Sequence, residues 1–270
     1  MAPLLRSELF RLTHRMMTRV MLLAMVALIV GAYVLLWSSS GSLSEAEQLD
    51  QEEHLRLANA PEYGMDIAYQ VGFLLSVILA SSSIATEYGW GTIRTVLART
   101  DSRSAFLGAK LMGVVVFIGV STLTGAASVF AGSAIVTAAG GLDAQLDGGF
   151  ATRALLSCGR VFVVLIPYAS LGFLVALWSR TTAAGIVVVV VAFYAEVLLT
   201  PLFEADGAFS WFPEDWLIYR NVRAILELNS PAPDLSFPDA WFGLGVLAVY
   251  STGFLAAAFW RFNTRDVTLS

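Results

Sequence analysis

The sequence predicts an all-α polytopic membrane protein with six transmembrane helices. Hydrophobic residues make up 57% of the 270 residues, and they occur in long blocks separated by polar segments. A helix needs about 20 mostly apolar residues to cross the hydrocarbon of a bilayer, and six blocks meet that length. We predict a single transmembrane domain over residues 1–270, with spans at residues 17–37, 65–86, 107–139, 160–178, 182–203 and 241–260.

The segment before the first span, residues 3–19, has the pattern of an amphipathic helix. Leu5, Leu9, Leu12 and Met16 recur at steps of four, three and four residues, and arginines lie on another face. Two interpretations fit this pattern equally well: an interfacial helix on the inner leaflet, or the basic flank of the first span. The apolar stretch that follows exceeds the roughly 7 to 15 residues of a signal peptide, so we expect the first span to be retained.

Residues 38–64 between the first two spans are polar and acidic. Ser44 and Glu47 have the spacing of a capping box, so a short helix should begin there and end before Pro61. Several serines follow in the second span, where such hydroxyls usually donate to their own helix. The alternative interpretation is that Ser76 and Ser83 line a substrate pathway.

Small residues mark the third span. Thr124, Ser128 and Gly132 recur every fourth residue, with Ser121 and Gly125 beside them, a pattern that favours close helix packing in lipid.

The remaining loops and spans follow the same logic. We predict a loop at residues 140–159, then a fourth span in which Pro167 should kink the helix or leave a carbonyl unpaired. Glu196 in the fifth span lies roughly 24 Å from Arg180 at about 1.5 Å per residue. An ionisable group at that depth is a candidate pathway or ion site, and a paired or solvated structural role explains it equally well. The acidic loop at residues 204–238 should contain a short helix at residues 216–228.

Basic and acidic residues fall mainly on opposite sides of the predicted membrane. If both termini are cytoplasmic, the inner segments carry eleven of the sixteen lysine and arginine residues and sum to +7, whereas the outer segments sum to −11. An excess of basic residues on the cytoplasmic side is the usual signature of orientation. The distribution therefore predicts cytoplasmic N and C termini, and a multi-pass protein of a bacterial inner membrane.

The sequence lacks the residues that several kinds of functional site require. The one lysine, Lys110, is followed by Leu111, so no phosphate-binding loop is present, and we expect no cofactor on this chain. His14 and His54 lie in different polar segments, which makes a histidine metal site improbable. Glu196 has no second acid within a span to form a catalytic pair. We therefore predict no enzyme activity, no metal site and no nucleic-acid partner.

The segment 87–110 is the polar interruption with concentrated positive charge. Thr92 can cap a short helix in which Ile93, Val96 and Leu97 share one face, while Arg94 and Arg99 point elsewhere. Asp101 or Ser102 then caps the helix of the third span. Such a helix suits the groove of a soluble partner, and an ordinary positive-inside loop is the alternative.

The amino-acid sequence of this segment, EYGWGTIRTVLARTDSRSAFLGAK, resembles the segment after the second span of ABC-2 type transporter permeases. The layout is similar too: a basic N-terminal helix, six spans, an outer helical insertion before the last span, and an aromatic then Arg-Asp ending at residues 262–266. The matching positions are Glu87, Gly91, Thr92, Arg94, Ser102, Arg103 and Lys110.

The resemblance implies the permease subunit of an ATP-binding cassette exporter. Such a subunit pairs with a second copy or a paralogue in the lipid, and it binds a separate cytoplasmic P-loop ATPase that holds ATP and Mg²⁺. Its substrate class is a drug, an antimicrobial peptide or a lipid-like molecule. A secondary transporter using Glu196 as an ion site and a non-transporting membrane scaffold are the alternatives. The residues expected to couple to the ATPase are Glu87, Gly91, Thr92, Ile93, Arg94, Val96, Leu97, Arg99 and Arg103.

Overall fold

The computed structural model describes residues 2–42, 44–93, 95, 102–144, 146–204, 214–229 and 237–264. All regular structure in these residues is helical, and six helices are long and apolar enough to cross a membrane. The predicted class, an all-helical protein consistent with a polytopic membrane protein, is confirmed at that level. The candidate spans are α2 (Met16–Ser39), α4 (Met65–Gly89), α6 (Arg103–Ala139), α7 (Phe150–Ser179), α8 (Thr182–Glu204) and α10 (Ala240–Thr264).

Shorter helices connect these spans. Helix α1 (Ala2–His14) precedes α2, and α9 (Ile218–Leu226) precedes α10. Helix α3 (Glu45–Leu55) begins where the capping box predicts, since the Glu47 carboxylate accepts hydrogen bonds from the Ser44 backbone N–H and hydroxyl at 3.1 and 2.6 Å. Single turns fill the gaps: η1 (Ser40–Ser42), η2 (Leu57–Asn59), η3 (Ala60–Gly64), η4 (Glu214–Trp216) and η5 (Glu227–Asn229).

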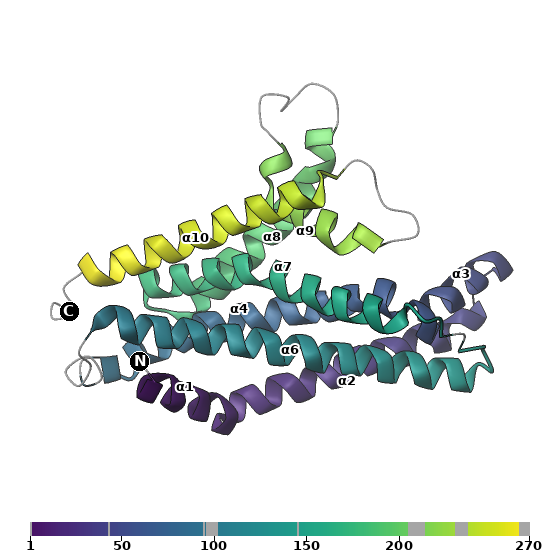
Figure 1. Cartoon of the computed structure of the whole chain (residues 1–270), viewed down its shortest axis with the longest axis horizontal. Coiled ribbons are helices and arrows are strands. Elements are labelled where there is room, and N and C mark those ends of the chain that lie inside the picture. Colours follow the sequence, from purple (N-terminus) through teal and green to yellow (C-terminus); the bar gives the residue numbers. More distant parts are fainter. Residues whose placement is uncertain are drawn as a thin grey trace.

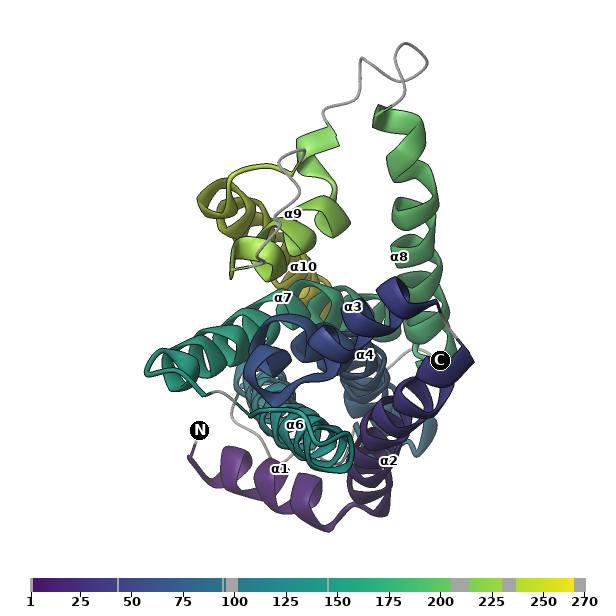
Figure 2. The ribbon, with the colours of Figure 1, turned by 90° about the vertical axis from the view of Figure 1, so that its right-hand side faces the viewer.

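Four spans form the body of the molecule. Helices α2, α4, α6 and α7 run side by side along the long axis, with α10 against α7 (Figure 1). Helix α8 leaves this bundle at an angle (Figure 2), and it contacts α9. We call the end of the bundle with Glu87, Ser179 and Thr264 the inner end, as the charge distribution predicts, and the opposite end with α3 the outer end.

Helix α4 is the most buried of the candidate spans. The small-residue pattern of α6 accounts for part of this packing. A Cβ atom on Gly125 would lie 2.5 Å from the Met25 side chain and 3.1 Å from the Ala68 Cβ, and one on Gly132 would lie 2.9 Å from the Tyr33 ring. The glycines therefore let α2 and α4 approach α6 closely, as the pattern predicts.

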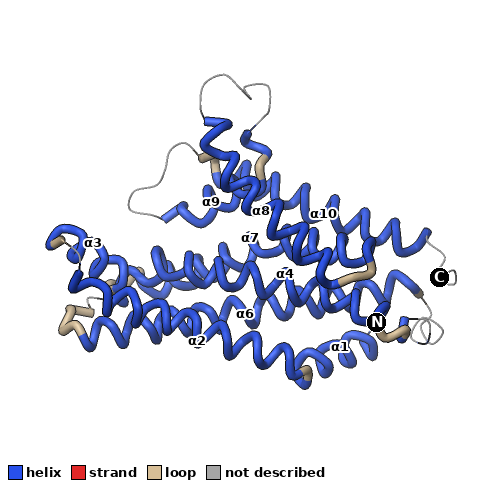
Figure 3. Tube along the Cα trace, turned by 180° about the vertical axis from the view of Figure 1, so that it is seen from behind, coloured by secondary structure: helices blue, strands red, loops and turns tan. Residues whose placement is uncertain are grey.

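Two predicted boundaries were wrong. The expected continuous helix over residues 3–19 divides at Arg15, whose backbone is extended (φ −71°, ψ 121°), so that α1 and α2 run in different directions (Figure 3). The expected loop at residues 140–159 ends at Gly149, because α7 starts at Phe150, ten residues before the apolar block. Residues 150–159 read FATRALLSCG, and the charge of Arg153 with Gly159 interrupts the apolar block, so hydropathy alone does not extend the span to Phe150. Helix α7 also continues through Pro167.

Candidate functional site

The segment after α4 turns sharply before α6 begins. Gly91 adopts a positive φ of 66°, a conformation that glycine accepts without steric cost, and Thr92 and Ile93 return to helical geometry. Ser102 then caps α6 by accepting a hydrogen bond from the Ala105 N–H at 3.4 Å. Four of the residues expected to form the coupling helix lie outside the described residues: Arg94, Val96, Leu97 and Arg99.

Glu87 occupies the centre of this end of the molecule. Its side chain lies in the last turns of α4 and is 1% exposed. The carboxylate accepts hydrogen bonds from Lys110 Nζ at 2.7 Å, Arg11 Nη1 at 2.7 Å and Thr92 Oγ1 at 2.5 Å. A buried carboxylate is costly unless it is paired and hydrogen-bonded, and three donors satisfy that requirement here.

Glu8 completes a four-charge group. Its Oε1 atom lies 2.9 Å from Lys110 Nζ and 3.2 Å from Arg11 Nη1. Glu8 and Arg11 come from α1, Glu87 from α4 and Lys110 from α6, so the contacts join three helices. The group holds two acids and two bases and therefore has no net formal charge. We call Glu8, Arg11, Glu87 and Lys110 the inner charge cluster. Glu87 and Lys110 also mark the two ends of the segment 87–110, and their ion pair holds these ends together.

The cluster also changes the acidity of the N-terminal arginines. Burial on its own lowers the pKa of Arg11, but the hydrogen bond to Glu87 and the charges of Glu87 and Glu8 outweigh it and raise that pKa. Arg15 shows the opposite balance, since burial and the neighbouring Arg11 charge lower its pKa. Arg11 is thereby held as the charged partner of Glu87, and α1 is anchored rather than lying free on a surface.

A cavity of about 290 Å³ opens beside the cluster. Its wall combines cations with aromatic and hydroxyl groups, including Arg15, Trp90, Thr86 and Ser83. Ser83 was predicted as a pathway residue, and it lies here with its hydroxyl donating to the Ala80 carbonyl at 2.8 Å. Ser76 is fully buried elsewhere along α4, and its hydroxyl has no hydrogen-bond partner among the described residues.

The structure corrects one predicted contact surface. Ile93, expected to face a partner together with Val96 and Leu97, is 4% exposed and packs in the core of this chain. Glu87 is likewise internal. Among the described residues of this segment, Trp90 is 68% exposed, and Gly91, Thr95, Ser102 and Arg103 are exposed as well.

Glu196 has a structural partner. Its Oε2 atom accepts the backbone N–H of Tyr219 at 2.6 Å, in the first turn of α9. A carboxylate at a helix N-terminus satisfies an otherwise unpaired N–H group and opposes the positive end of the helix dipole. This contact supports the structural interpretation of Glu196, which joins α8 to α9.

Sequence reasoning identified Glu87 and Lys110 but did not predict that they pair with each other, with Arg11 and with Glu8. Two comparisons with known proteins add context. Residues 25–268 match the family described as protein of unknown function (DUF2705). The chain is also similar to the uncharacterized protein YhcI of Bacillus subtilis (strain 168), with 26% identity over 212 residues. That alignment covers 72% of this chain and 64% of YhcI, so it spans less than two thirds of the relative.

Proposed function

The chain belongs to the DUF2705 family of proteins of unknown function, and we propose that it is the permease subunit of an ATP-binding cassette exporter. In this proposal both termini and the segment 87–110 face the cytoplasm, where a separate ATPase binds. The chain forms the membrane pathway with a second copy or a paralogue. The observation that carries the proposal is the inner charge cluster, because it ties the segment after the second span to three helices at once.

The cluster supplies a way to transmit force. A loop that is free at its ends absorbs a push by bending, whereas the ends of this segment are held by the 2.7 Å contact between Lys110 and Glu87. Thr92, five residues after Glu87, bonds to the same carboxylate. A displacement of the turn at Trp90 and Gly91 is therefore passed to α1, α4 and α6 as one body.

The position of the turn supports docking of a soluble partner. Exposed tryptophan and arginine side chains are enriched at protein interfaces, and Trp90 and Arg103 are both exposed at the polar inner end. The ATPase would contact this outer surface of the turn, while Glu87 and Ile93 hold the turn in place from within.

Site-directed cross-linking tests the proposal. In a Cys158→Ser background, Ser102→Cys introduces a thiol at the inner turn and Ser44→Cys provides a matched control at the opposite end. A membrane-impermeant maleimide should label the control from outside the cell and Ser102→Cys only from the cytoplasmic side. A bifunctional reagent at Ser102→Cys should then capture a P-loop ATPase.

Equal labelling of both sites from one side would refute the topology. Failure to capture an ATPase at Ser102→Cys, or equal capture at both sites, would refute the permease assignment. Transport by the purified chain without ATP would instead favour a secondary transporter.

A further inference from the structure

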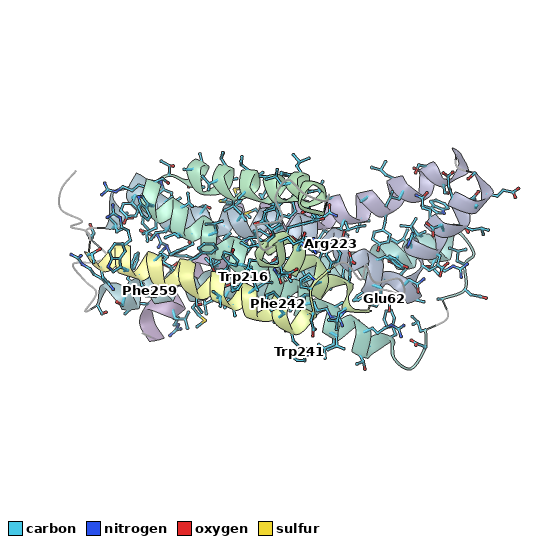
Figure 4. All side chains as sticks on the ribbon, turned by 90° about the horizontal axis from the view of Figure 1, so that it is seen from above. Glu62, Trp216, Arg223, Trp241, Phe242 and Phe259 are labelled. Carbon is cyan, nitrogen blue, oxygen red and sulfur yellow. The ribbon has the colours of Figure 1, made fainter. Side chains whose placement is uncertain are left out.

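A cavity lies at the outer end of the bundle. It measures about 390 Å³, within the size range of small-molecule sites, and it lies among η3, α4, α7 and α9. Charged side chains dominate its lining: Glu62, Asp66, Arg160, Arg223 and Glu227. Glu62 and Arg223 lie toward the same end of the molecule, whereas Phe259, in the last turns of α10, lies far from both (Figure 4). We call it the outer cavity.

The carboxylates of the outer cavity have partners within the chain. Asp66 Oδ1 lies 2.8 Å from Arg223 Nη1, and Arg223 also pairs with Glu227. Glu62 Oε1 lies 2.9 Å from the Nε atom of Arg153, which stands outside the cavity. Each acid of the lining thus pairs with an arginine of this chain other than Arg160.

Arg160 differs from these groups. It is half-buried in the cavity wall, and among the described residues it has no hydrogen bond or ion pair. The nearby charge of Glu62 acts on it from beyond contact distance. A guanidinium carries five N–H donors in a planar fork that matches phosphate and carboxylate groups. A half-buried fork without a protein acceptor is a site for an anion from outside the chain.

The depth of Arg160 points to the class of anion. At the inner end, the Arg180 guanidinium lies 5.4 Å from the Tyr88 ring centroid, and the Arg261 guanidinium lies 5.2 Å from the Trp178 ring centroid. The inner ends of α4, α7 and α10 therefore lie at one level. Arg160 precedes Arg180 by a helical distance of roughly 30 Å, the thickness of the hydrocarbon core. Asp66 precedes Tyr88 by about 33 Å on α4. The outer cavity therefore lies at the level of the outer headgroups.

We propose that the outer cavity binds a phosphate-bearing headgroup, with Arg160 as the residue that holds the phosphate. Tyr63 and Ser157 add hydroxyl groups to the same wall. The cavity accommodates a glycerophosphate-sized group, and acyl chains of a lipid would extend from there toward the membrane centre, along the part of α7 that follows Arg160. The shared chemistry is a phosphate ester, supplied by a phospholipid or by a free phosphate compound. This proposal is independent of any ATPase partner.

Binding to the purified full-length chain in detergent tests the proposal. Two probes separate the sources: dihexanoyl phosphatidylglycerol for the lipid, and glycerol 3-phosphate for the free compound. Each is titrated while the thermal midpoint of unfolding is followed, since a ligand that binds only the folded state stabilises it by RT ln(1 + [L]/Kd). Stabilisation that follows this concentration dependence for the lipid alone identifies a lipid site, and stabilisation by both probes identifies a site for free phosphate esters.

Arg160→Gln should weaken binding by about tenfold or more, because it removes a charge-assisted bidentate contact. Arg56→Gln, a cation on the same predicted side that does not line the cavity, should bind like the unmodified chain. If Arg160→Gln does not fold, Arg160→Lys keeps the charge but loses the fork, and its affinity should still fall several-fold. The proposal is overturned if neither probe gives concentration-dependent stabilisation, or if the Arg160 variants bind as tightly as the unmodified chain.

Discussion

Lys110→Met gives the sharpest test of the inner charge cluster. Lys110 is 4% exposed, and its ammonium contacts both Glu87 and Glu8, at 2.7 and 2.9 Å. Methionine fills similar space without charge, so the substitution leaves the buried acids with one cation fewer. Removing one member of a buried pair typically costs about 3 to 5 kcal/mol. Because Arg11 and Thr92 still donate to Glu87, we expect a loss near the lower limit, about 3 kcal/mol.

A double-mutant cycle separates this effect from lost packing. Glu87→Gln removes the other charge, and the double variant Glu87→Gln/Lys110→Met should be more stable than the sum of the single losses predicts, by about 1 to 3 kcal/mol. Unfolding by denaturant in detergent, followed by circular dichroism, measures each free energy. Arg6→Met replaces an exposed cation on α1 and should change stability by less than about 0.5 kcal/mol. Additive single losses would show that Lys110 and Glu87 do not stabilise each other, and the cluster would then carry no mechanical argument.

Three further predictions concern other parts of the chain. Gly132→Ala forces a Cβ to within 2.9 Å of a tyrosine ring of α2 and should cost about 1 to 3 kcal/mol, whereas Gly253→Ala, with no atom within 4 Å, should be neutral or stabilising in the same unfolding assay. Glu196→Gln should lower stability by about 0.3 to 1 kcal/mol through the α9 terminus and leave transport unchanged, whereas loss of gradient-driven transport in this variant would favour an ion site. The hydrogen bond from Arg153 lowers the pKa of Asp147. The stability that this pair adds is therefore present above the unfolded pKa of about 4, and it is lost as pH falls through the lower folded pKa. Asp147→Asn should remove that part of the acid dependence of stability, and an unchanged profile of stability against pH would contradict this prediction.

The sequence predicts the spans well because hydrophobic length is a local property. Five of the six predicted spans begin within about four residues of the helices found, and the capping box at Ser44 locates the start of α3. Each of these signals lies within one short stretch of chain. The boundary at Phe150 is the exception, since α7 begins ten residues before the predicted span, in a stretch that Arg153 and Gly159 interrupt.

Contacts between distant segments of the chain could not be predicted from the sequence. Arg11 and Glu87 are separated by 76 positions, and either residue alone fits a plain positive-inside or interfacial role. The pattern of Ile93, Val96 and Leu97 predicts an apolar face but not which body it meets, and the core of the chain covers Ile93. Arg160 carries no motif at all. Its significance comes from Asp66, Glu62 and the arginines that neutralise them, which only the packing of η3, α4, α7 and α9 brings together.

Helix α4 links the two sites. Asp66 lines the outer cavity from its first turn, and Glu87 lies in the inner charge cluster near its last turn, about 32 Å away. The helix between them contains no proline and is packed on most sides, so it moves more readily as a rigid rod than by bending. A push on the turn after Gly89 that shifts α4 along its axis would therefore reach the pair of Asp66 and Arg223 undiminished. Release of that pair would leave Arg223 bonded to Glu227 alone, in the same cavity wall as Arg160.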